Sequence, residues 1–138
     1  MNTFTYDQLT VGQTESFQTV VTAEMLDKFT EISGDINPLH CNEEFARQQG
    51  YPGRVVYGML TASFYSKLAG VYLPGKYCLL QEITTKFRSP VFIGDILTIT
   101  GTISEKNDTC KRISIKAEIV NEKGKKVSKA IIQIGVDK

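Results

Sequence analysis

Asp35 and His40 are the two residues whose side-chain types and close spacing together suggest proton transfer. His40 is the only histidine, and it ends the stretch Asp-Ile-Asn-Pro-Leu-His. Imidazole is the side chain whose ordinary pKa lies nearest neutrality. A carboxylate and an imidazole held side by side can share a water molecule, one taking a proton from it and the other returning a proton to a substrate. A lone histidine is usually structural, and an aspartate often serves in a turn. The spacing alone therefore leaves both roles open.

The elements around this pair predict a rigid loop between two helices. Apolar residues three apart predict a helix over Ala23–Ser33, and Gly34 can end it in the left-handed conformation. A second, short helix is expected over residues 42–49, capped by Asn42. Pro38 interrupts simple helix continuation between them. His40 is therefore expected in a polar loop between two helix ends.

Gly58 is the second feature with chemical potential. It lies at or near the start of the segment Val55–Ala69, which is almost wholly apolar or small and predicts a buried helix. Glycine inside a helix is unfavourable by up to about 1 kcal/mol relative to alanine. Close packing of helix on sheet could require it. Alternatively, a substrate carbonyl could approach the N–H groups at the helix start, which would stabilise a developing enolate. Both reasons stay open.

The rest of the chain predicts strands. Alternating or β-branched segments bounded by turns are expected to form five of them: 14–21, 78–88, 96–105, 112–121 and 125–136. One buried helix followed by long antiparallel strands predicts an α+β fold, with the sheet wrapped around the helix. The length of 138 residues predicts a single domain over residues 1–138.

Composition excludes several classes of function. With 16 basic and 15 acidic residues, the chain gives no case for nucleic acid and shows no broad basic face. No apolar run is long enough to span a membrane, and no signal peptide is visible. The odd number of cysteines, Cys41, Cys78 and Cys110, favours a reducing compartment, so we expect a cytoplasmic protein. One histidine and one aspartate form a poor ligand set, so no metal is expected.

Three segments carry a family resemblance. The stretch FTEISGDINPLH, residues 29–40, resembles the hydratase-2 signature of the MaoC-like (R)-specific enoyl-CoA hydratases. YGMLTAS, residues 57–63, is similar to the His-Gly-Met-Leu stretch of that family. FRSPVFIGD, residues 87–95, resembles its strand ending in Pro-Val followed by Gly-Asp. The three segments have the family's order and spacing, and the resemblance covers about residues 14–136.

The resemblance implies a hot-dog fold and a set of site residues. Asp35 and His40 would be the catalytic pair, and Asn37 would hold their loop in place. Gly58 would offer its N–H to the thioester oxygen, and Ser66 would line or order the site. The family usually forms homodimers that bind acyl-CoA near the subunit interface.

Two departures from the family pattern concern the surroundings of the pair. The family usually has histidine before the glycine, where this chain has Tyr57, which would form the pocket wall beside the thioester. That histidine is not the family's proton-transfer residue, so the departure affects the pocket rather than the pair. Cys41-Asn42 stands where Leu-Asp is common, and Asn42 can still cap the next helix.

The expected function is a hydratase of fatty acid metabolism that adds water reversibly to a trans-2-enoyl-CoA, giving an (R)-3-hydroxyacyl-CoA without a cofactor. The acyl group could also be carried by acyl carrier protein, although the lack of a basic patch favours CoA. One alternative is a hot-dog acyl-CoA thioesterase. Another is a non-catalytic acyl-thioester binding subunit, which Tyr57 keeps open. A nucleophilic Cys41 is the least favoured, because sequence neighbours such as His40 and Cys41 point apart on an extended loop.

Overall fold

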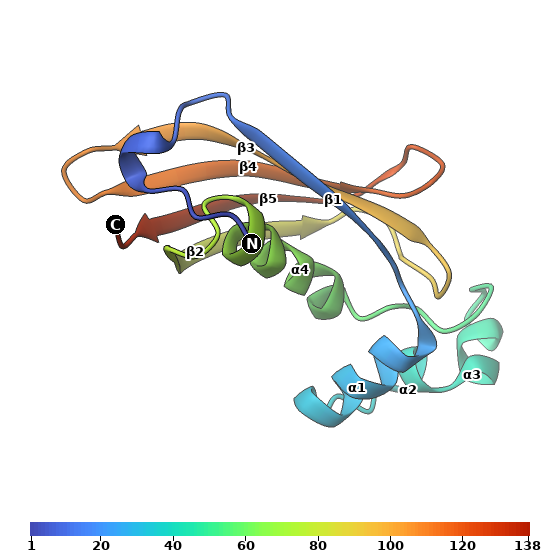
Figure 1. Cartoon of the computed structure of the whole chain (residues 1–138). Coiled ribbons are helices and arrows are strands. Elements are labelled where there is room, and N and C mark those ends of the chain that lie inside the picture. Colours follow the sequence, from blue (N-terminus) through green and yellow to red (C-terminus); the bar gives the residue numbers. More distant parts are fainter.

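A five-stranded antiparallel sheet forms the frame of the molecule, shown in Figure 1. The computed structural model describes all residues, 1–138. The strand order across the sheet is β1-β3-β4-β5-β2. The strands are β1 (Thr14–Val20), β2 (Cys78–Phe87), β3 (Ile96–Asn107), β4 (Arg112–Val120) and β5 (Lys126–Val136). A short 3₁₀ helix, Tyr6–Gln8, precedes β1. All five predicted strands are confirmed, with small changes at their ends.

Alternation of side chains explains why the inner strands form. In β3, residues Leu97, Ile99 and Ile103 are buried, whereas the threonines between them are partly exposed. Successive side chains of a strand point to opposite faces, so this pattern gives the sheet one apolar face. At Gly101 in β3, a Cβ atom would lie 2.6 Å from the Leu68 side chain, so glycine allows the neighbouring helix to approach the sheet.

Helix α4 (Gly58–Lys67) packs against that apolar face, beneath the arch of the sheet in Figure 1. The hydroxyl of Tyr65 donates to Ser128 Oγ of β5 at 2.9 Å, and both residues are buried. A π-helical turn, Leu68–Tyr72, continues the helix. One core of 27 buried residues joins helix and sheet. This is the predicted hot-dog arrangement.

The start of this helix differs from the prediction. The segment 55–57 is not helical, because Val56 N–H donates to Val91 O at 2.8 Å and Val55 forms an isolated bridge with Phe92. These contacts hold the chain extended, so α4 begins at Gly58. Apolar composition alone could not separate a buried extended segment from a buried helix.

Three short helices lie beyond one end of the sheet in Figure 1: α1 (Ala23–Ser33), α2 (Pro38–Cys41) and α3 (Glu43–Gln48). Helix α1 has the predicted limits, with Gly34 at φ 72° after its last turn. The predicted loop around His40 is wrong in one respect. Pro38 begins α2, with Asn37 Oδ1 accepting from Leu39 N–H at 3.0 Å. Proline suits the first turn of a helix, where its missing N–H is not needed.

Strand β2 differs from the inner strands because it lies at the edge of the sheet and pairs only with β5. Most of its residues are exposed, including the apolar Leu79, Leu80, Ile83 and Phe87. A long exposed apolar edge is a template for pairing with another chain, so natural proteins usually cover it. None of the helices combines the length and apolar character needed to cross a bilayer.

Candidate active site

A cavity of about 330 Å³ opens where α4 begins. Its wall includes His40 of α2, the first turn of α4 and the segment 87–91, which begins at the last residue of β2. Gly58 and His40 thus face the same space, as the resemblance implied. Phe87 and Val91 give the cavity an apolar side, whereas His40, Thr61 and Arg88 give it polar groups.

One hydrogen bond fixes the proton on the His40 ring. The Nδ1 atom lies 2.7 Å from the Val55 carbonyl oxygen. A carbonyl oxygen can only accept, so Nδ1 carries the hydrogen and the neutral ring keeps a free lone pair on Nε2. The ring also stacks on Tyr57, with 4.2 Å between centroids. His40 is therefore held both in position and in tautomer, with Nε2 available as a proton acceptor.

Tyr57 packs behind the segment that carries Asp35 and His40. It is 2% exposed and does not line the cavity. Its hydroxyl donates to the Asp35 carbonyl oxygen at 2.6 Å and lies 2.7 Å from Thr30 Oγ1 and 3.3 Å from Cys41 Sγ. Burial, followed by the contact with Cys41, raises the pKa of Tyr57, so the hydroxyl stays protonated and remains a donor. The sequence suggested that Tyr57 forms part of the pocket wall. In the structure it lies behind the wall and contacts His40 and Asp35 instead.

The side chains of Asp35 and His40 do not form a hydrogen bond with each other. Asp35 is exposed, and its carboxylate is absent from the cavity wall. Its Oδ1 accepts from Asn37 N–H at 3.1 Å, which leaves Oδ2 without a partner. Tyr57 links the pair, with its hydroxyl on the Asp35 backbone and its ring on His40. Asn37 caps the helix that carries His40, which matches the supporting position expected for it.

Gly58 combines close packing with free N–H groups at the helix start, the two explanations that the sequence left open. A Cβ atom there would lie 3.3 Å from Phe87 Cζ, so packing favours glycine. No side chain caps α4, and the N–H groups of Gly58, Met59 and Leu60 have no acceptor in the protein. Together with the helix dipole, these donors favour negative charge near the helix start. Since Gly58 lines the cavity, the arrangement can hold a thioester oxygen there.

Two further residues belong to the site, and sequence reasoning missed both. Thr61 lines the cavity, is 2% exposed, and is the only buried side chain whose oxygen has no hydrogen-bond partner. Its position three residues after Gly58, on the same helical face, is a signal that the sequence contained. By contrast, Ser66 is exposed and lies outside the cavity wall.

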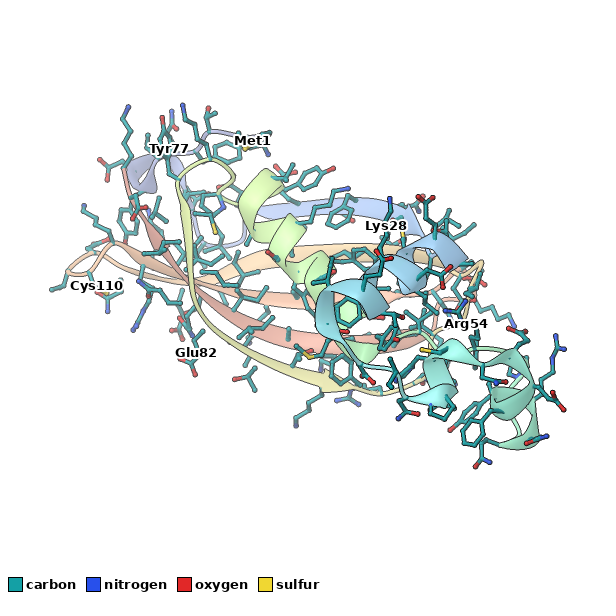
Figure 2. The ribbon with its side chains drawn as sticks, turned by 90° about the horizontal axis from the view of Figure 1, so that it is seen from below. Met1, Lys28, Arg54, Tyr77, Glu82 and Cys110 are labelled. Carbon is teal, nitrogen blue, oxygen red and sulfur yellow. The ribbon has the colours of Figure 1, made fainter.

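Arg54 is the second missed residue, and it joins two elements around the site. Its Nε donates to the His40 carbonyl oxygen at 2.6 Å, and its Nη2 donates to Asp27 of α1 at 3.0 Å. Figure 2 shows Arg54 at the end of the molecule that carries the short helices, far from Cys110 at the other end. The guanidinium therefore holds the backbone of α2 against α1 without entering the cavity.

Comparison with known proteins identifies the family. The model of the MaoC-like domain matches residues 8–125. The chain belongs to this family. Among MaoC-like relatives, it is 33% identical over 99 residues to the (R)-specific enoyl-CoA hydratase of Rhodospirillum rubrum, covering 72% of the chain and 69% of that protein. It is 35% identical over 100 residues to the 3-hydroxybutyryl-CoA dehydratase of Methylorubrum extorquens, covering 72% of the chain. The match spans 64% of the Methylorubrum protein, slightly less than two thirds.

A solved structure supports the MaoC-like fold as well. The unliganded R-hydratase of Pseudomonas aeruginosa superposes with a TM-score of 0.91 at 28% identity, covering 96% of this chain and 84% of that one. The predicted MaoC-like, hot-dog fold is therefore confirmed.

Proposed function

We propose that the protein is an enoyl-thioester hydratase, which adds water to a trans-2-enoyl-CoA to give an (R)-3-hydroxyacyl-CoA and catalyses the reverse dehydration. The observation that carries this proposal is one cavity holding both a tautomer-fixed His40 and the free N–H groups at the start of α4. An acceptor for a water proton and donors for a thioester oxygen are what conjugate addition of water requires. The named activities of the Rhodospirillum and Methylorubrum relatives support it.

The proposed mechanism assigns a role to each group. The Gly58 N–H holds the thioester oxygen and draws electron density from C3 of the enoyl group. His40 Nε2 faces the cavity and accepts a proton from a water above C3. Asp35 is proposed as the second base on this water, which requires its carboxylate to turn toward the cavity when substrate binds. Hydroxide adds to C3, and the proton is delivered to C2 on the same face. Water is consumed and no electrons leave the substrate, so the atoms balance without a cofactor.

A homodimer is part of the proposal. Strand β2 leaves one edge unpaired and exposes Leu79, Leu80, Ile83 and Phe87. A second copy pairing along this edge would satisfy the unpaired backbone groups and bury the apolar side chains. Because Phe87 also lines the cavity, such an interface would lie beside the acyl group. Light scattering of the purified protein tests this, and a monomeric mass at micromolar concentration would contradict it.

The first experiment is loss of enoyl absorbance when the protein meets crotonyl-CoA, with the Asp35→Asn variant as the control. Consumption by the unaltered protein and not by the variant supports the proposal. Release of free thiol from a saturated acyl-CoA would indicate the thioesterase instead, and tight binding without turnover would indicate the binding subunit. The same assay with crotonyl-loaded acyl carrier protein tests whether that protein, rather than CoA, carries the substrate. The cytoplasmic location stays a prediction from the cysteine count.

A further inference from the structure

A second hollow lies on the face of the sheet turned away from α4. Its volume is about 300 Å³, and strands β2, β4 and β5 with the residue after β2 form it. Four of its eight lining residues are basic: Lys86, Arg88, Lys116 and Lys129. We call this the cationic groove. The net charge of +1 and the scattered basic residues gave no sign of this local cluster in the sequence.

Strand register brings these charges together. Lys86 of β2 lies directly opposite Lys129 of β5, and Lys116 of β4 lies opposite Ile131. Like charges facing one another across a sheet are destabilising. None of the four basic residues forms a salt bridge. Glu118 lies opposite Lys129 in the β4–β5 register, but its carboxylate pairs with Lys126 at 3.2 Å. The groove thus has more positive than negative side chains, and an anion would neutralise the excess.

The groove and the candidate active site share one lining residue. Arg88 lines both the catalytic cavity and the cationic groove. A ligand that occupies both hollows would pass Arg88. Arginine binds phosphate through a fork of donors, and lysine binds it as a point charge. Ile131, 49% exposed, adds an apolar surface in the groove that suits a flat base.

We propose that the cationic groove binds the 3′-phosphate and diphosphate of the coenzyme A moiety while the acyl thioester occupies the cavity. This inference rests on the proposed function, because the thioester must lie in that cavity. A carrier protein would present a single phosphodiester on a broad acidic surface. Several phosphates held close together match a small concave groove with four cations better.

The test compares two substrates and two sets of variants. The Lys86→Ala/Lys129→Ala variant is assayed with crotonyl-CoA and with crotonyl-pantetheine, which lacks the phosphates. Charge-assisted hydrogen bonds contribute about 1.5–3 kcal/mol each, so losing the contacts raises the KM for crotonyl-CoA by about tenfold or more. The KM for crotonyl-pantetheine and both kcat values stay near those of the unaltered protein. The matched control is Lys123→Ala, which removes a lysine from the exposed β4–β5 turn and leaves the KM for crotonyl-CoA unchanged.

Several outcomes overturn the inference. Equal losses on both substrates, or no loss on either, exclude a phosphate site in the groove. A higher KM only for crotonyl-loaded carrier protein assigns the groove to that partner instead. If no hydration occurs, the proposed function has failed, and calorimetric titration with adenosine 3′,5′-bisphosphate tests the groove by itself. Saturable binding weakened by salt and by the double substitution supports the groove. If the unaltered protein shows no saturable binding, the groove is not a phosphate site.

Discussion

Replacing Tyr57 with phenylalanine tests how the catalytic loop is held. The substitution keeps the ring that stacks on His40 and removes only the hydroxyl that donates to the Asp35 carbonyl at 2.6 Å. A neutral hydrogen bond contributes about 0.5–1.5 kcal/mol net. Asp35 is exposed, so water can replace the donor. Thr30 keeps its bond to the Leu26 carbonyl at 2.9 Å. We therefore expect a loss of about 1 kcal/mol in unfolding free energy, or a fall in Tm of roughly 3–5 °C.

The effect on catalysis is expected to be larger than this loss of stability suggests. Without the hydroxyl, the Asp35 carbonyl keeps only the long 3.9 Å contact from the Cys41 thiol of α2. A small misplacement of a catalytic group costs substantial rate, so kcat for crotonyl-CoA hydration should fall by about tenfold or more, with little change in KM.

Tyr65→Phe provides the matched control. Tyr65 is also buried, and its hydroxyl also makes a short bond, 2.9 Å to Ser128 Oγ, but it lies outside the cavity wall. Burial raises the pKa of Tyr65 to about 12, so this hydroxyl too is a donor at neutral pH. Both variants should lose similar stability, and only Tyr57→Phe should lose turnover. Equal kcat values in the two variants, measured beside their melting temperatures, would refute the supporting role of Tyr57.

Three further predictions concern the cavity. Asp35→Asn and His40→Ala should each lower kcat by at least about 10²–10⁴-fold without unfolding the protein. Steady-state kinetics and circular dichroism check this, and near-normal rates in either variant would refute the assignment of that residue to catalysis. Gly58→Ala should leave Tm nearly unchanged, because the gain in helix propensity of up to about 1 kcal/mol opposes the 3.3 Å contact with Phe87. Alanine keeps the N–H, so kcat/KM should fall only because the added methyl group hinders the thioester; an unchanged kcat/KM would exclude close approach of the thioester to Gly58. Thr61→Val should raise Tm, since the hydroxyl is buried without a partner, yet raise KM several-fold; an unchanged KM would mean that Thr61 does not meet substrate.

Local patterns in the sequence predicted most of the fold. The limits of α1 followed from apolar spacing and from Gly34, whose φ of 72° suits glycine. The strands followed from alternation. Pro38 shows where such patterns are ambiguous, because a proline that interrupts one helix can equally begin another. The start of α4 was misplaced for a different reason: bonds from Val56 to Val91, distant in sequence, hold that segment extended.

The site was predicted in part. The motif brought His40 and Gly58 to one cavity, but the groups that support them come from elsewhere in the chain. Arg54 reaches both His40 and Asp27, and no local pattern relates those residues. The cationic groove depends on strand register, which places Lys86 opposite Lys129. Contacts of this kind arise from tertiary packing and are not visible in local spacing.

The backbone of residues 55–60 supplies both the carbonyl that orients His40 and the free N–H groups at the helix start. Main-chain atoms survive any substitution that keeps the local conformation, so the chemistry at this site does not depend on which side chains Val55 and Val56 carry. Both side chains line the cavity. Under the proposed function, changes at these two positions would alter acyl-chain preference while the reaction itself is retained.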